Sequence, residues 1–336
     1  MQMSHFKEGV TKRSKSDSSP KVDGYNKKNA QRVKQYIGEY SEAPEQYKFM
    51  IYIKTGYRIG FTDSFSILKS LFMWHNETIN IWSHLIGFIW YICLLVFFEL
   101  YITPEGINCS RESLASSLLQ SITISDYSIQ NLDTSRIPIY IHFFGGMVCM
   151  FSSSTYHLFA CKCVKTYNTL AKCDIGSIIF FCGCLFYPIC YYIFYCDATT
   201  HFMYVYIIIG NLSCFLLIFY LFQPVFITPQ FRVYRTLLLM GISLIGFLPI
   251  IQYYLFNDHK NFPVVNMNLI LGGDILYVFG AVIYMIKIPE KYFPIRFDYC
   301  GWSHNIWHLC VLVAGMMHSL ASIALYYERI MKKCDC

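Results

Sequence analysis

The chain has 336 residues, of which 55% are hydrophobic, 18% aromatic and only 14% charged, and its net charge is +6. This composition is too apolar for a soluble domain of that length and is typical of an integral membrane protein. No nucleic acid is expected as a partner, and the sequence contains no glycine-rich phosphate loop of the kind that nucleotide-binding proteins use.

The first 56 residues form a basic, polar arm that we expect to be cytosolic and mostly disordered, because it has too few apolar residues to bury a core. In the next stretch, 57–78, apolar residues recur at spacings of three and four residues: Phe61, Phe65, Leu68 and Phe72. This spacing predicts an amphipathic helix at the membrane interface. Alternatively, this stretch simply leads into the first span, and the basic arm only sets the topology and contacts anionic lipid.

The rest of the chain predicts an all-α membrane protein, with a seven-helix bundle over 79–329 and a short tail at 330–336. Stretches of about 20 apolar residues are long enough to cross a hydrocarbon core of about 30 Å. The predicted spans are 79–99, 136–160, 174–195, 202–222, 236–256, 268–287 and 304–327. Pro188 and Pro249 fall inside spans and are expected to kink or locally open them.

Basic residues are unevenly distributed among the segments that connect the spans. Lys and Arg are concentrated in the arm and in 161–173, 223–235 and 288–303, and they are sparse in the alternate connections. The positive-inside rule therefore predicts a cytosolic N-terminus and an exoplasmic C-terminus. This is the reverse of the topology of G-protein-coupled receptors, so no G protein is expected as a partner. The loop at 100–135 would be exoplasmic, which agrees with the glycosylation sequon that begins at Asn108.

Two histidines, His304 and His308, stand four residues apart at the start of the last span. On a helix this spacing places both imidazoles on one face, where one metal ion can reach them. In the predicted topology, His157 at the end of the second span and Asp174 at the start of the third lie at the same depth, in the cytosolic leaflet. Ser153 shares a helical face with His157. Such a concentration of polar groups is costly in a membrane unless they share a partner.

These residues predict a metal centre with His157, His304 and His308 as ligands and an open fourth position, as in catalytic zinc sites. The all-imidazole ligand set favours zinc (Zn2+), although ligand type alone does not exclude copper or iron. Asp174 would hold the bound water by a hydrogen bond or act as a general base, and Ser153 would also point into the site.

The remaining histidines and the cysteines have simpler interpretations. His84, His142 and His318 are expected to be hydrogen-bonded residues of the bundle interior. Most of the 15 cysteines fall inside spans, where they pack as small apolar residues, so no disulfide framework is predicted. Cys161 and Cys163, next to the membrane on the predicted cytosolic side, are candidates for palmitoylation.

Taken in chain order, these motifs resemble those of the progestin and adipoQ receptor family, which includes the adiponectin receptors. The residues that carry the resemblance are the stretch Asn76–His84, Ser153, His157, Asp174, the stretch Lys287–Pro294, Ser303, His304 and His308. The resemblance implies a seven-helix bundle of inverted topology with an intramembrane zinc site. Within the family, the chain is most similar to the Golgi-resident member that traps Raf kinase.

The resemblance implies two classes of function. The first is a membrane signalling protein or receptor of the Golgi, whose N-terminal region tethers a Raf-type kinase and dampens MAP-kinase signalling, with zinc in a structural role. The second is a zinc-dependent, ceramidase-like hydrolase of lipid amides, in which Asp174 acts as the base and Ser153 stabilises the oxyanion. A plasma-membrane receptor of the adiponectin or progestin type is a further alternative. Membrane lipids are expected partners in every case.

Overall fold

A computed structural model describes residues 34–102, 134–195, 200–256 and 264–331. In these ranges seven helices are long and apolar enough to cross a membrane, which confirms the predicted number. All the helices and strands described below belong to one compact unit, Gln35–Cys336. Most of the arm, most of the 100–135 loop with its sequon and most of the 330–336 tail lie outside the described residues.

The long helices follow the predicted spans closely at most of their ends. Their bounds are α2 Thr78–Tyr101, α5 Ile137–Phe159, α6 Val164–Ile193, α7 Thr200–Leu221, α11 Val264–Ile286 and α12 Ser303–Met331. The largest difference is in α6, which begins at Val164 and not at 174. Polar residues such as Lys165 and Lys172 continue this helix beyond its apolar part, so hydropathy alone does not detect its first turns.

Two helices form the fifth span where the sequence predicts one. They are α9 Arg232–Ile245 and α10 Leu248–Phe256, and the short segments α8 Pro224–Ile227 and η5 Pro229–Phe231 precede them. The break between α9 and α10 covers Gly246 and Phe247 and lies just before Pro249, which has no N–H to continue the hydrogen bonds of α9. The local opening predicted at Pro249 is thus confirmed, whereas α6 continues through Pro188.

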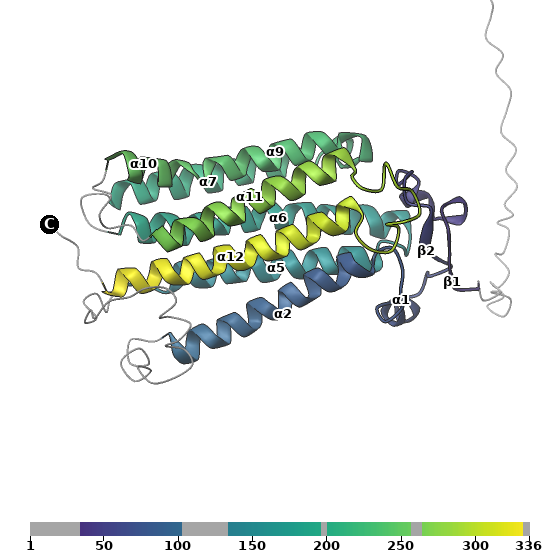
Figure 1. Cartoon of the computed structure of the whole chain (residues 1–336). Coiled ribbons are helices and arrows are strands. Elements are labelled where there is room, and N and C mark those ends of the chain that lie inside the picture. The colour runs from purple at the N-terminus through teal and green to yellow at the C-terminus, as the bar shows by residue number, and fades with distance from the viewer. Residues whose placement is uncertain (1–33, 103–133, 196–199, 257–263, 332–336) are drawn as a thin grey trace, which may run out of the picture. The chain divides into compact units, whose positions relative to one another are not determined.

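Helix α12 lies between α11 and α2 in the view of Figure 1, and its membrane-spanning part is the most buried of the seven described. It packs against α11 and also contacts α2, α5 and α6. In α12, 67% of the membrane-spanning part is buried, compared with 22% in α7. Gly280 allows α11 to come close, since a Cβ there would lie 2.7 Å from Cys310 Cβ. The paired histidines at the start of α12 are therefore within reach of several other helices.

A small β-hairpin and a short helix precede the first span, at the end of the bundle where α2 and α12 begin (Figure 1). Strand β1, Tyr36–Glu39, pairs antiparallel with β2, Thr55–Ile59. The turns η1 and η2, at Tyr40–Glu42 and Glu45–Tyr47, connect the strands. Helix α1, Ser64–Ser70, follows and is N-capped by Asp63, whose side chain accepts a hydrogen bond from Ser66 N.

This region differs from the sequence prediction in two respects. Residues 35–56 are folded and do not belong to a disordered arm, and helix extends only over Ser64–Ser70 instead of 57–78. The cause is tertiary packing. The ring of Tyr57 is buried in a cluster that includes Trp302, far away in the sequence. The apolar spacing in the sequence therefore reflects contacts with the bundle as well as a helix.

The connection before α12 holds the hairpin in place. Asp298 is fully buried, and its Oδ2 accepts hydrogen bonds of 2.8 Å from both Lys54 N and Thr55 N. A carboxylate that accepts several backbone N–H groups makes strong, charge-assisted contacts. The start of β2 is therefore fixed to the segment that leads into α12.

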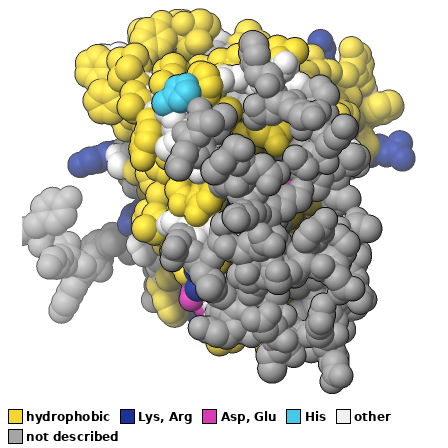
Figure 2. Space-filling model, turned by 90° about the vertical axis from the view of Figure 1, so that its left-hand side faces the viewer, with side chains coloured by type: hydrophobic (Ala, Val, Ile, Leu, Met, Phe, Trp, Pro, Cys, Tyr) yellow, Lys and Arg dark blue, Asp and Glu magenta, His cyan; other side chains and the backbone are white. Residues whose placement is uncertain are grey.

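The outer face of the bundle is apolar. On α7, for example, the side chains of Ile208, Phe215 and Phe219 are 63%, 66% and 68% exposed. Figure 2 views the end of the bundle opposite the hairpin and shows hydrophobic side chains over much of the described surface, with few charged ones. An apolar exterior of this extent requires contact with lipid.

Candidate metal centre

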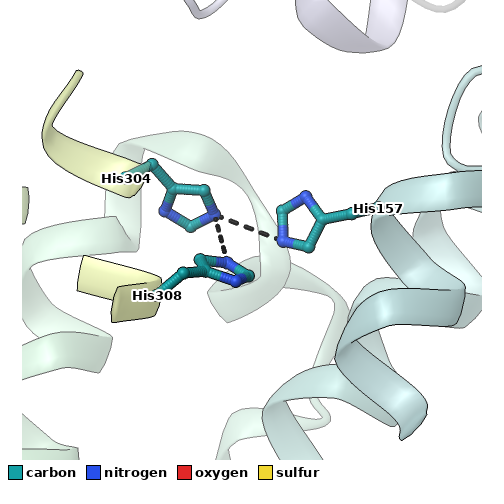
Figure 3. Close-up of side chains that lie close together, drawn as sticks. All are labelled: His157, His304 and His308. Carbon is teal, nitrogen blue, oxygen red and sulfur yellow. Dashed lines mark hydrogen bonds between the residues drawn. The ribbon is translucent and has the colours of Figure 1, made fainter. Parts of the chain in front are cut away.

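Three histidines from two helices lie together at the hairpin end of the bundle (Figure 3). His304 and His308 are in the first turns of α12, and His157 is near the end of α5. His304 Nε2 lies 3.3 Å from His157 Nε2 and 3.3 Å from His308 Nε2. One nitrogen of each ring lies within 4.8 Å of the other two. The structure thus brings together all three predicted ligands.

The spacing of these nitrogens fits a tetrahedral metal ion. Nitrogens bound to zinc at about 2.1 Å with tetrahedral angles lie about 3.4 Å apart. The two separations of 3.3 Å that involve His304 agree with that value, and the third pair, His157 and His308, lies within 4.8 Å. Hydrogen bonding alone does not satisfy the group, because His304 Nε2 is shared by two contacts, and a neutral ring nitrogen is either one donor or one acceptor. A shared cation satisfies all three lone pairs, although copper and iron also accept imidazole ligands.

Glu77 fixes the orientation of the His157 ring. Its Oε2 lies 2.8 Å from His157 Nδ1, and both side chains are about 5% exposed or less. Asn80 Nδ2 donates to the same oxygen at 2.7 Å, and Asn305 Nδ2 donates to Asn80 Oδ1 at 2.7 Å. An Nδ1–H that donates to a carboxylate leaves Nε2 free to bind a metal. This chain of contacts links α2, α5 and α12 at the metal centre.

The sequence prediction assigned no role to Glu77, although the signal was available. A carboxylate directly before an apolar span is costly unless it has a partner. Burial opposes ionisation of this group, but the neighbouring His157, with His304 and Asn80, lowers the pKa of Glu77 to about 2. Glu77 is therefore a carboxylate at neutral pH and can accept a hydrogen bond from His157 Nδ1–H.

The turn between α1 and α2 contains another buried histidine, His75. His75 Nδ1 accepts a hydrogen bond from Glu77 N at 3.1 Å, and His75 Nε2 lies 3.2 Å from Ser70 O. Burial, and then the nearby Arg58, lower the pKa of His75 to about 3. The ring is neutral at physiological pH, so its Nδ1 can accept a hydrogen bond from Glu77 N. This contact positions the Glu77 backbone.

The hairpin and the connection before α12 support the two helices that carry the ligands. Arg58, on β2, donates to His157 O at 2.7 Å and to Leu158 O at 2.8 Å, so it caps the last turn of α5. Buried Glu290 accepts a 2.8 Å hydrogen bond from Ser303 N, the first residue of α12. These charge-assisted contacts, at the end of α5 and the start of α12, fix the positions of the helix ends that carry the ligands.

Asp174 and Ser153 lie beside the histidines, as predicted, but Asp174 is not at the start of its helix. It is several turns into α6, because that helix begins at Val164. Asp174 lies close to His157 and Ser153, and its Oδ1 is buried without a hydrogen-bond partner among the described residues. Ser153 is 2% exposed, one turn before His157 on α5. Asp174 therefore has an unpaired acceptor next to the metal centre.

Two cavities meet at the metal centre. One, of about 130 Å³, is lined by His157, His304 and Asp174 and extends toward Arg232 at the hairpin end. The other, of about 220 Å³, is lined by His304 and His308 and extends into the bundle between mainly apolar side chains. The metal centre is thus accessible to an apolar molecule that lies inside the membrane-spanning part.

The structure also places the three histidines for which a simpler role is expected. His142 Nε2 lies 3.2 Å from Ser319 Oγ, as a hydrogen-bonded interior residue should. His84 differs from the expectation, since neither ring nitrogen has a hydrogen-bond partner in the described chain. Its ring lies against His308, with centroids 4.0 Å apart. His318 lies deeper in the bundle, close to Asp274.

The chain is similar to known membrane proteins over most of its length. A family model described as haemolysin-III related matches residues 72–319. Heptahelical transmembrane protein 1 of Arabidopsis thaliana is 31% identical over 288 residues, which cover 84% of this chain and 79% of that protein. Progestin and adipoQ receptor family member 3 of Mus musculus is 28% identical over 300 residues, 88% of each chain. The adiponectin receptor protein of Drosophila melanogaster is 26% identical over 295 residues, 86% of this chain and 60% of that one.

Proposed function

The chain belongs to the haemolysin-III related family, in agreement with its resemblance to the progestin and adipoQ receptors, and from this premise we propose that it is a zinc-dependent hydrolase of lipid amides. The observation that carries the proposal is a buried three-histidine cluster on the wall of a largely apolar cavity. Three protein ligands leave a fourth position for water or substrate, whereas structural zinc sites use four protein ligands.

Each group at the centre has a role in the proposed reaction. His157, His304 and His308 would hold a zinc ion, which when bound would supply a water of lowered pKa and polarisation of the amide carbonyl. Asp174 accepts the proton of the attacking water and passes it to the nitrogen as the carbon–nitrogen bond breaks. Ser153 donates its hydroxyl proton in a hydrogen bond to the carbonyl oxygen as negative charge develops. The products are a fatty acid and an amine, which account for all atoms of the lipid amide and water.

The substrate class follows from the surroundings of the centre. The larger cavity, of about 220 Å³, is bordered by side chains such as Phe181, Leu185 and Val311. Such a lining suits an acyl chain, because the chain exchanges one apolar environment, the lipid tails, for another. A long-chain ceramide, which carries an amide at the base of an acyl chain, is therefore the proposed test substrate.

The experiment uses purified full-length protein in lipid nanodiscs with long-chain ceramide. We expect release of fatty acid that stops after chelation and returns with added zinc. Asp174→Asn should lower kcat by about 10²- to 10⁴-fold, the usual contribution of a general base, and leave bound metal unchanged. A metal-loaded protein that releases no more fatty acid than the metal-free double variant His304→Ala, His308→Ala would refute the hydrolase proposal.

A second function, a Golgi tether for a Raf-type kinase, is favoured by the surface next to the hairpin. Phe65, Phe72 and Trp74 are 67%, 81% and 56% exposed, and they follow the basic arm in the sequence. We propose that the arm faces the cytosol and that this apolar surface rests on the membrane, which would leave the arm free to hold a kinase. Zinc would then chiefly fix α5 to α12.

The test of the tether must spare the folded hairpin. Deletion of residues 1–33 removes the part of the basic arm that precedes β1 and leaves β1 and β2, whereas deletion of 1–56 removes β1 and the first two residues of β2. We expect the full-length protein to be at the Golgi by fluorescence microscopy and to recruit a Raf-type kinase, and the 1–33 deletion to lose recruitment only. Unchanged recruitment contradicts the tether. Protease protection of N- and C-terminal tags tests the orientation, and a plasma-membrane location favours the receptor alternative.

A further inference from the structure

A second polar cluster lies inside the bundle, away from the metal centre. It consists of Asp274 and Tyr277 on α11 and His318 on α12. His318 follows His308 by ten residues, which corresponds to about 15 Å along a helix axis. All three residues line the same 220 Å³ cavity that reaches His304 and His308. This cavity therefore has polar groups at two separate places, with apolar walls between them.

Two polar atoms of this cluster lack hydrogen-bond partners among the described residues. His318 Nε2 lies 3.3 Å from Asp274 Oδ1, but outside hydrogen-bonding geometry, and it has no hydrogen-bond partner in the described chain. The Tyr277 hydroxyl is also buried without one. His318 is only 4% exposed. Buried polar groups are normally hydrogen-bonded, and an ionisable residue within a membrane span usually marks a functional site.

Packing holds the Tyr277 and His318 rings in this arrangement. The Tyr277 and His318 rings are stacked, with centroids 5.6 Å apart and an interplanar angle of 17°. Gly273 allows the His318 ring to lie against α11, since a Cβ there would be 2.8 Å from His318 Nε2. The unpaired atoms are therefore fixed in position and presented to a common space.

We propose that Asp274, Tyr277 and His318 bind a hydroxyl group carried part-way along the acyl chain of a lipid whose head lies at the three-histidine centre. The inference rests on the proposed function, which supplies the lipid substrate. A hydroxyl suits this cluster because its oxygen accepts from Tyr277 and its proton is donated to Asp274. A metal ion suits it less, since the only metal-type group of three ligands within the described ranges is the histidine centre.

The site should discriminate between acyl chains with and without the hydroxyl group. A plain acyl chain leaves the buried polar atoms unpaired, whereas a hydroxylated chain satisfies them. The test measures equilibrium binding of two free fatty acids to the full-length protein: octadecanoic acid and its analogue with a hydroxyl near the middle of the chain. Binding of these probes requires no hydrolysis, so failure of the proposed enzyme activity is observed separately in the ceramide assay.

We expect the wild type to bind the hydroxylated acid about tenfold more tightly than octadecanoic acid. Tyr277→Phe, which removes only the unpaired hydroxyl, should reduce this preference to about twofold and leave the affinity for octadecanoic acid unchanged. The matched control Tyr204→Phe alters a lipid-facing tyrosine of α7 that is 58% exposed and should have no effect.

Two results would overturn the inference. Equal affinity of the wild type for the two acids means that the cluster does not recognise the hydroxyl and is satisfied by water. A Tyr277→Phe variant that loses affinity equally for both acids shows a structural role only. Asp274→Asn provides a second variant with the same shape, and it must also lower the preference without lowering the metal content.

Discussion

The two sides of the bundle are held together differently. Around α12, polar side chains connect the elements to one another: Glu77 on α2 contacts His157 on α5, and Asn80 contacts Asn305 on α12. Between α7 and α9, buried apolar residues such as Leu217 and Ile242 make the contact instead. Accordingly, 67% of the spanning part of α12 is buried but only 22% of that of α7.

This difference shows which contacts define the metal centre. Apolar contacts carry little directional information in a membrane, because lipid tails are as apolar as leucine. Hydrogen bonds between buried side chains fix distance and angle, and metal ligands need both. The α12 side should therefore be sensitive to single polar substitutions, and the α7 side should tolerate conservative changes.

The largest effect is expected when a ligand is removed. His304→Ala or His308→Ala should abolish stoichiometric metal binding, because two imidazoles do not hold the ion as three do. Metal analysis of purified protein measures this. His201→Ala on α7, an exposed histidine, is the matched control and should bind metal normally. Equal metal content in all three variants would show that the cluster is not the binding site.

The next largest effect should come from the anchor of the hairpin. Asp298→Ala removes an acceptor of hydrogen bonds from Lys54 N, Thr55 N and Thr55 Oγ1. The loss of stability should be about 3 kcal/mol, because three partly buried donors lose a charged acceptor. Thermal unfolding and the rate of proteolysis within the hairpin measure the change. Asp298→Asn keeps one acceptor oxygen and should show a smaller effect, and an unchanged stability of Asp298→Ala would contradict the anchoring role.

A smaller effect is expected at the group that orients His157. Glu77→Gln removes the carboxylate that faces His157 Nδ1 and should weaken zinc binding by about 10- to 100-fold. Competition with a chelator of known affinity measures this. Glu99→Gln, at the other end of α2, alters a 46% exposed carboxylate and should leave the affinity unchanged. If the two variants bind zinc equally well, Glu77 does not orient the ligand.

The smallest effect is expected on the α7 side. Phe215→Leu replaces a lipid-facing side chain that is 66% exposed. Stability should change by less than about 0.5 kcal/mol, because leucine, like phenylalanine, is an apolar side chain that contacts lipid favourably. Metal content should also be unchanged. Thermal unfolding and metal analysis of the same sample measure stability and metal content. A loss of metal in this variant would show that the α7 side is as sensitive to substitution as the α12 side.

Much of the architecture could be predicted from residues that are close in sequence. Apolar runs identified seven spans, and the four-residue spacing of His304 and His308 indicated a shared helical face. Both signals are local, because helix period and hydrocarbon thickness act on neighbouring residues. Charge distribution predicted an orientation, and this orientation placed His157 at the same depth as the paired histidines.

The positions that were missed depend on distant partners. A carboxylate before an apolar span indicates that Glu77 needs a partner, but the sequence does not show that this partner is His157, 80 residues away and 2.8 Å from it. Asp298 and Thr55, which are 243 residues apart, likewise explain why part of the basic arm is folded. Local composition cannot reveal such pairs, since the free energy gained by folding a segment comes from residues that no local window contains.

By itself, then, the sequence determined the class of protein, the number of spans and the identity of the three histidines, because hydrophobic length and helical period are properties of short segments. Only the tertiary structure decided the 3.3 Å approach of His304 to His157 and His308, the orientation of His157 by Glu77, and the common cavity that reaches His318. These features require backbone positions to be fixed across several helices, and packing and buried hydrogen bonds fix them once the chain has folded.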